Sequence, residues 1–165
     1  MKRSVLAAAL LCALAAQPVL AQGLLTTHRI PAALAAEAVT TAVSTCAAQG
    51  FSVTAALLDV DGVLQAFVRG DGAGIHTVQF AQDKAMTAIS FRTDTSAMVE
   101  RAKTAPPPAA VVKLPGLVLA NGGVVILGPD GKEVLGGIAV SGVPNPTGDE
   151  ACAKAGIAKI VDRMK

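Results

Sequence analysis

One stretch organises the fold: Arg69 to Arg92 reads RGDGAGIHTVQFAQDKAMTAISFR. It opens with a glycine-rich turn and His76, one of only two histidines in the chain. Apolar residues then recur at helical spacing from Val78 to Ile89. Thr77 is a suitable N-cap for this helix, because its hydroxyl can accept a hydrogen bond from a free backbone N–H. The stretch therefore predicts the end of a strand, a loop and the start of a helix.

The residues before this stretch predict a helix and a hairpin. Pro31 suits the first turn of a helix, and apolar residues recur at helical spacing until Gly50, which predicts a helix over residues 31–48. Residues 52–58 are largely apolar and β-like. An Asp-Val-Asp-Gly turn at residues 59–62 then separates this strand from a second one over 63–68.

The residues after the stretch predict a short helix, three strands and a last helix. The short helix covers 96–103 and is followed by an irregular, proline-rich segment over 104–116. Strands at 117–120, 124–127 and 133–140 are joined by tight turns, which predicts an antiparallel meander. Gly148 or Asp149 caps a helix that runs to about residue 164. The expected class is α+β, a five-stranded antiparallel sheet with helices packed on it.

The first 21 residues have the features of a secretory signal peptide. Lys2 and Arg3 precede an apolar run, and cleavage after Ala21 would leave a single domain over residues 22–165. The apolar run is too short for a membrane span, and no later stretch predicts one. The expected location is the periplasm or the outside of the cell.

The composition excludes a nucleic-acid-binding protein. Two of the 14 basic residues lie in the signal segment, which leaves 12 basic against 12 acidic residues. A domain that binds nucleic acid normally has a basic excess. The chain contains four Phe and no Trp or Tyr, so it also offers few aromatic rings for stacking on bases.

Two of the three cysteines, Cys46 and Cys152, remain after cleavage. In an exported protein they can form a disulfide, which requires the first and last helices to be neighbours. The alternative is that both are small buried hydrophobic residues.

His76 is the main candidate for a binding residue. It lies near the N-terminus of a helix, which favours an anion, and a neutral imidazole can also bind a transition metal such as haem iron. The alternative is an ordinary polar loop residue. Arg69, Lys84 and Arg92 add positive charge to the same stretch, although each could equally be a solvated surface charge. Phosphate-loop, dinucleotide-binding, nucleophile-elbow and zinc motifs do not match the sequence.

An ordered set of short motifs resembles the GlcG/HbpS-like haem-binding, or haem-degrading, family. The motifs are Asp59-x-Asp-Gly, Arg69-x-Asp-Gly-Ala-Gly-x-His-Thr, Lys84-Ala-x-Thr-Ala with Phe91, Leu114-Pro-Gly, Gly122-Gly, Gly137-Ile-Ala-Val-Ser-Gly and Asp149-Glu-Ala-Cys-Ala-x-Ala-Gly. They cover nearly all of the chain after the signal segment, in the family's order.

The resemblance implies a GlcG-like, profilin-like fold and a homo-oligomer that binds haem. His76 is then the candidate iron ligand, and Thr77 is an alternative because some members use a hydroxyl. Arg69, Lys84 or Arg92 would face the propionates. The expected function is to capture or buffer haem, and the absence of an evident acid–base pair favours a binding protein. The alternatives are a peroxide-dependent haem-degrading enzyme and an oligomeric module that binds a small carboxylate.

Overall fold

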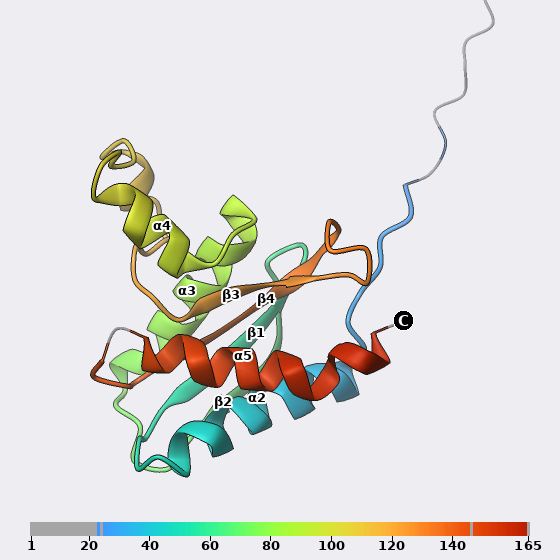
Figure 1. Ribbon diagram of the computed structural model, residues 1–165, viewed down its shortest axis with the longest axis vertical. Helices are drawn as coiled ribbons and strands as arrows, with labels where there is room; N and C mark the ends of the chain where they lie inside the picture. The colour runs from blue at the N-terminus through green and yellow to red at the C-terminus, as the bar shows by residue number, and fades with distance from the viewer. Residues whose placement is uncertain (1–22, 24, 146, 165) are drawn as a thin grey trace, which may run out of the picture.

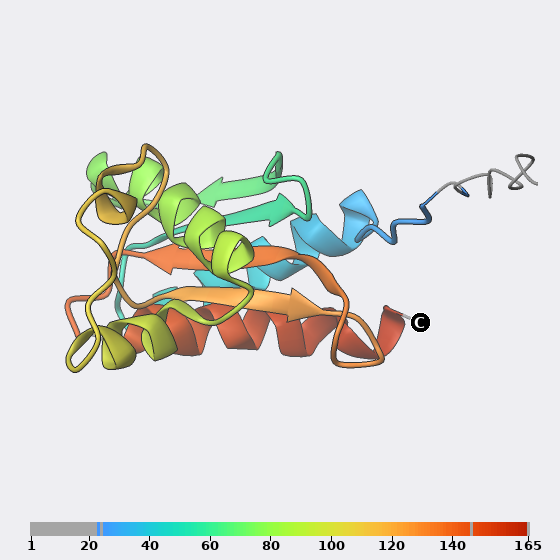
Figure 2. The same cartoon turned by 90° about the horizontal axis from the view of Figure 1, so that it is seen from above.

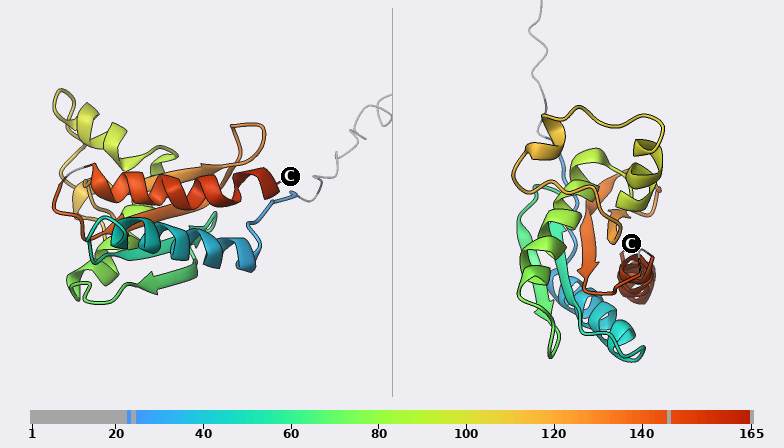
Figure 3. Two further views of the ribbon diagram at one scale, coloured as in Figure 1. Left: turned by 60° about the horizontal axis from the view of Figure 1, so that its bottom comes forward. Right: turned by 90° about the vertical axis from the view of Figure 1, so that its left-hand side faces the viewer.

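The computed structural model describes residues 23, 25–145 and 147–164, so the predicted signal segment lies outside the described residues. The described chain forms three layers, with a sheet between helices (Figure 1). Helices α2 (Ala32–Ala47) and α5 (Gly148–Ile160) lie side by side on one face of the sheet (Figure 3). Helix α3 (His76–Phe91) crosses the other face (Figure 2). These layers confirm the α+β class.

The sheet has four antiparallel strands in the order β2-β1-β4-β3. Strands β1 (Thr54–Asp59) and β2 (Leu64–Arg69) form the first predicted hairpin, and β3 (Gly123–Leu127) and β4 (Val134–Ser141) form a second. Strand β1 also pairs with β4, so the first hairpin is joined to the second in the middle of the sheet.

The predictions of a fifth strand and of a three-stranded meander are wrong. Residues 117–120 belong to no strand in the described structure. The Val118 N–H donates to the hydroxyl of Thr87 on α3, at 2.9 Å, instead of joining a ladder. The segment therefore follows the helix layer and enters the sheet only at Gly123.

Alternating side chains divide the core between the two faces of the sheet. Ala55 and Leu57 of β1 pack towards α2 and α5, whereas Ala56 and Leu58 pack towards α3. Helix α3 meets the sheet with alanines such as Ala81 and Ala85, which are fully buried. Small residues on both sides allow a short distance between helix and sheet.

The helix ends differ from prediction at two places. Helix α3 begins at His76, so Thr77 lies in its first turn and is not the N-cap. The Thr77 hydroxyl donates to the Gly74 carbonyl at 2.6 Å and lies 2.7 Å from the hydroxyl of Thr54. Helix α5 ends at Ile160 and is followed by a 3-10 turn, Val161–Arg163. The short helix α4 (Thr95–Ala102) lies close to its predicted place.

A disulfide joins Cys46 of α2 to Cys152 of α5, as one of the two sequence interpretations predicted. Both residues are almost fully buried. The bond closes a separation of 106 residues, and it ties together the two helices that cover one face of the sheet. None of the described helices combines the length and apolar character that crossing a membrane requires.

Candidate functional site

A cleft of about 470 Å³ lies where the N-terminal half of α3 faces the loop between β4 and α5. Its lining comes from α3, α4, the segment before β3, the end of β4 and the start of α5. The lining residues are His76, Phe80, Lys84, Val99, Leu119, Ala120, Asn121, Ser141, Gly142, Val143, Pro144, Asn145 and Asp149. A volume of this size is typical of sites for small molecules and cofactors.

Helix α3 supplies one wall of the cleft through three residues at intervals of four. His76, Phe80 and Lys84 share one face of the helix because residues four apart lie one above the other. His76 is exposed, Phe80 is half-buried and Lys84 is only 3% exposed. The wall therefore runs from an accessible imidazole to a buried ammonium group.

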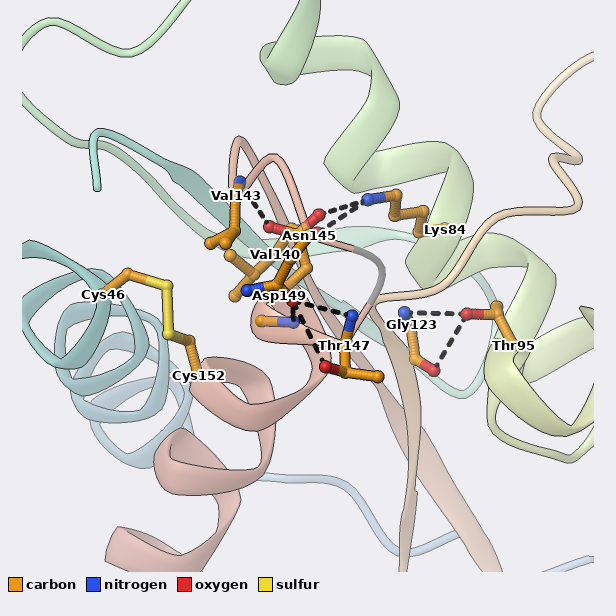
Figure 4. Close-up of polar contacts among 11 residues, drawn as sticks. Cys46, Lys84, Thr95, Gly123, Val140, Val143, Asn145, Thr147, Asp149 and Cys152 are labelled. Atoms are coloured by element: carbon orange, nitrogen blue, oxygen red, sulfur yellow. Dashed lines mark hydrogen bonds and ion pairs between the residues drawn. A yellow bond between two sulfur atoms is a disulfide. The ribbon is translucent and has the colours of Figure 1, made fainter. Parts of the chain in front are cut away.

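The buried ammonium group forms an ion pair with the first turn of α5. Lys84 Nζ lies 2.7 Å from Asp149 Oδ2 and donates to the Val140 carbonyl at 3.1 Å (Figure 4). The other oxygen of Asp149 accepts from the Val143 N–H at 2.9 Å. The side chains of Lys84 and Asp149 are 3% and 8% exposed. The pair therefore connects α3, the end of β4 and the start of α5 in a region that water hardly reaches.

Two glycines allow this close approach. Gly122 has φ +116°, and a Cβ built there would lie 2.7 Å from the Val140 carbonyl oxygen and 3.1 Å from Lys84 Nζ. A Cβ at Gly123 would lie 2.3 Å from the Lys84 carbonyl oxygen, too close for any side chain. The backbone conformation thus requires glycine at position 122, and close packing against α3 requires glycine at position 123.

Two further polar side chains, those of Ser141 and Asn121, line the cleft. Ser141 is only 3% exposed. The side-chain oxygen of Asn121 is buried and has no hydrogen-bond partner among the described residues, and the same is true of the Gln65 oxygen outside the cleft. Buried polar groups are normally satisfied, so an unpaired oxygen in the wall of the cleft is unusual.

Asn145 closes the cleft near the N-terminus of α5. Its side-chain oxygen accepts from the backbone N–H groups of Thr147 and Gly148, at 3.0 and 2.7 Å (Figure 4). These bonds satisfy donors that the first turn of a helix leaves free. The loop that faces α3 is therefore held to α5 by Asn145 on one side and by Asp149 on the other.

Of the five residues predicted for the site, the structure brings His76 and Lys84 into the cleft. Thr77 follows His76 but points into the core, where it is 1% exposed and bonded to Thr54 and Gly74.

The other two predicted cations lie elsewhere. Arg69 donates from Nε to the Ala73 carbonyl at 2.9 Å and lines a different hollow, beside the end of α2. Arg92 is the C-cap of α3, in a left-handed conformation with φ 53°. It is 16 residues from His76, or about 24 Å along a helix, so the two cannot face one small group.

The prediction missed Asp149, Asn121 and Ser141 as parts of one site. Asp149 was considered as a helix cap, and Asn121 lies in the tight turn that was predicted before the strand at 124–127. The one sequence signal for Asp149 was its place at the head of the last family-like motif. No sequence signal marked the unpaired side-chain oxygen of Asn121, because its surroundings depend on how distant segments meet.

His28, the other histidine, lies at a separate hollow of about 500 Å³, which Glu133 and Arg163 also line. Its Nδ1 is 2.8 Å from Glu133 Oε2 on the turn before β4, and its side chain is 70% exposed. Asp130 of the same turn accepts from the backbone N–H groups of Lys132 and Glu133, which lower the pKa of its carboxyl. No group of three or more His, Cys, Asp or Glu side chains suited to a metal occurs among the described residues.

Comparisons with known proteins agree with this architecture. Residues 30–158 match the model of the family described as haem degrading protein HbpS-like. The crystal structure of HbpS is 31% identical, with a TM-score of 0.76 over 86% of this chain and 99% of that chain. A double mutant of HbpS from Streptomyces reticuli is 32% identical, with a TM-score of 0.76 over 88% of this chain and 98% of that chain.

A more distant structure, a complex of PduOC with heme, shares the fold at 21% identity, with a TM-score of 0.71 over 79% of this chain and 94% of that chain. No curated protein matches the sequence significantly. The family match spans most of the chain and includes every residue that lines the cleft. The chain therefore belongs to the HbpS-like family of haem-degrading proteins.

Proposed function

We propose that this protein binds haem in the cleft between α3 and the β4–α5 loop, with His76 as the iron ligand. The observation that carries the proposal is the position of His76: an exposed imidazole lies at the mouth of a cleft that also contains apolar side chains and one buried cation. Histidine is a common axial ligand of haem iron, and it binds through a neutral ring nitrogen.

The lining of the cleft fits the chemistry of haem. Phe80, Val99 and Leu119 offer apolar surface for a porphyrin ring. Lys84 is the predicted cation that shares the cleft with His76, so we assign the propionate contact to Lys84 rather than to Arg69 or Arg92. The bound iron would supply redox chemistry, whereas the protein would hold the ring and exclude water from one of its faces.

The comparisons support a haem-related function for the chain. The matched family is described as haem degrading, and one structure with the same fold is a heme complex. Thr77 is a weaker candidate for the ligand because its hydroxyl is buried and bonded to Thr54 and Gly74. Ligation by Thr77 would require the iron to reach a hydroxyl of a residue that is 1% exposed, whereas His76 is exposed.

Hemin titration followed by absorption spectroscopy tests the assignment. Wild type is expected to shift the Soret band at a 1:1 ratio, and His76→Ala is expected to lose this shift and to bind hemin at least tenfold more weakly. His28→Ala is the matched control, because it removes the only other histidine, which lies at a different hollow. An unchanged Soret spectrum in His76→Ala would exclude His76 as the ligand.

The family description also favours a second function, the peroxide-dependent degradation of haem. In this case the protein–hemin complex would lose its Soret band under peroxide faster than free hemin, and an open-chain tetrapyrrole would form. Bleaching at the rate of free hemin, with no such product, would leave capture or buffering as the function.

Export and self-association complete the proposal. The N-terminal 21 residues support export, which cell fractionation and N-terminal sequencing would test. A chain that stays in the cytoplasm and keeps Met1 would contradict export.

Exposed apolar side chains support a homo-oligomer, since Ile75, beside His76, is 82% exposed. Light scattering on the purified protein would give the subunit number, and a monomer at micromolar concentration would contradict self-association.

A further inference from the structure

Helix α4 and the proline-rich segment that follows it form one end of the molecule, far from the C-terminus (Figure 1). Residues 101–129 contain three basic residues and no acidic one, although the chain after the signal segment has equal numbers of both. The three are Arg101, Lys103 and Lys113, and Arg92 lies nearby at the end of α3. This end of the molecule is therefore positively charged.

Most of this charge is not neutralised within the described chain. Lys103 Nζ lies 2.5 Å from Glu100 Oε2 on α4. Arg92, Arg101 and Lys113 are exposed and form no ion pair among the described residues. Three side chains thus present unpaired positive charge to whatever meets this surface.

Three large apolar side chains are exposed beside these cations: Phe91 is 39%, Val112 44% and Leu114 53% exposed. Phe91 and Val112 line one hollow between α3, α4 and the proline-rich segment, so they belong to one surface. Single exposed apolar residues are common, but a group of them indicates a contact surface. We call the apolar and basic residues together the loop patch, which consists of Phe91, Arg92, Arg101, Val112, Lys113 and Leu114.

The loop patch has the chemistry of a surface that docks on a lipid bilayer. In such contacts the apolar side chains enter the boundary between headgroups and acyl chains, while Lys and Arg remain level with the anionic headgroups. We propose that this protein docks on an anionic membrane surface through the loop patch. Contact of this kind is peripheral and reversible.

The charge of the loop patch argues against a second copy of the chain as its partner. In a two-fold interface the patch would meet itself, so Arg101 and Lys113 would face their own copies and repel them. A bilayer rich in acidic phospholipid presents the opposite charge. Prolines at positions 106–108 and 115 also restrict the segment, which lowers the entropy that docking would cost.

The loop patch adjoins the cleft. Leu119 lines both the cleft and the hollow that Phe91 and Val112 line. Docking would therefore hold the cleft near the bilayer surface. The proposal goes beyond haem binding and is tested on haem-free protein, so its outcome and that of the Soret titration are separate.

Sedimentation with lipid vesicles tests the proposal on residues 22–165, which contain every described residue. The vesicles are phosphatidylcholine alone or with about 30% phosphatidylglycerol, at about 100 mM salt. Anionic vesicles should bind with an apparent dissociation constant on the order of 1 mM accessible lipid, and neutral vesicles at least tenfold more weakly. Salt at about 500 mM should release most of the bound protein. Equal binding to both kinds of vesicle, or no binding at several millimolar anionic lipid, would overturn the proposal.

Charge variants assign the contact to the loop patch. Arg101→Gln/Lys113→Gln should weaken binding to anionic vesicles about tenfold or more, because each basic residue near such a surface contributes about fivefold. The matched control is Lys132→Gln/Lys159→Gln, which removes two exposed charges from the end of the molecule near the C-terminus. It should change binding by less than about twofold. An equal loss in both variants would show that net charge alone attracts the protein, and the loop patch would be refuted as the docking surface.

An apolar pair of variants tests insertion. Val112→Ser should weaken vesicle binding about threefold or more. Val161→Ser is its control, because Val161 is 46% exposed, nearly as Val112 is, and lies on the turn after α5. Circular dichroism checks that each variant is folded. Equal effects of the two substitutions, or a changed subunit number of Val112→Ser in light scattering without vesicles, would overturn membrane docking by the loop patch.

Discussion

Replacing Lys84 by Met should destabilise the protein far more than a typical charge substitution. The variant keeps most of the apolar stem but leaves Asp149 buried, with the Val143 N–H as its remaining donor in the described structure. Removing one partner of a buried ion pair typically costs about 3–5 kcal/mol, because the other charge remains without compensation. This is a large part of the 5–15 kcal/mol that is usual for the free energy of unfolding of a domain.

A double-mutant cycle separates the ion pair from the loss of packing. Asp149→Asn keeps an oxygen for the Val143 N–H and removes the negative charge. The double variant Lys84→Met/Asp149→Asn has no buried charge at this place, so it should be more stable than the sum of the single effects predicts. We expect the difference from additivity to be about 1–3 kcal/mol.

Urea unfolding followed by circular dichroism, with the disulfide intact, gives the free energy of unfolding of each variant. The matched control is Lys103→Met, which breaks an ion pair with Glu100 whose side chains are 64% and 73% exposed. It should cost less than about 1 kcal/mol. If Lys84→Met cost no more than this control, or if the cycle were additive, the buried pair would not have the structural role inferred from its burial.

Three further predictions concern other parts of the fold. Replacing Cys46 and Cys152 by Ala should lower the free energy of unfolding by about 2–5 kcal/mol, measured by urea unfolding, because their bond closes a separation of 106 residues; no change would contradict this. Gly123→Ala should reduce the yield of folded protein or its melting temperature, because the new Cβ meets the Lys84 carbonyl; wild-type stability would contradict this. Backbone N–H donors lower the pKa of Asp130 in the folded state from its ordinary value of 3.8. The ionised carboxylate therefore stabilises the folded state above pH 3.8, and this stabilisation is lost as the pH falls through the lower pKa of the folded state. Asp130→Asn should therefore flatten the pH dependence of the urea midpoint below about pH 4, and an unchanged slope would contradict this.

The parts of the fold that could be predicted are those with local causes. The β1–β2 hairpin follows from an Asp-rich turn between two apolar runs, and α3 follows from alanines at helical spacing. The segment 117–120 has the same apolar character as a strand, yet its N–H at Val118 bonds to Thr87. Sequence pattern alone cannot say whether an extended segment pairs with a strand or with a helix side chain, because the choice depends on contacts between distant residues.

The cleft depends even more on contacts between residues that are far apart in the sequence. Lys84 and Asp149 are 65 residues apart, and no periodicity relates them. One local signal was nevertheless present. Lys84 comes three residues after Ala81 and four before Ala88, so it lies on the apolar face of the helix, whereas a solvated lysine would lie on the opposite face. A lysine on an apolar face must be paired or must reach a cavity, since an isolated buried charge is too costly. In this structure Lys84 does both, and that combination makes the floor of the cleft the most informative place to test by mutation.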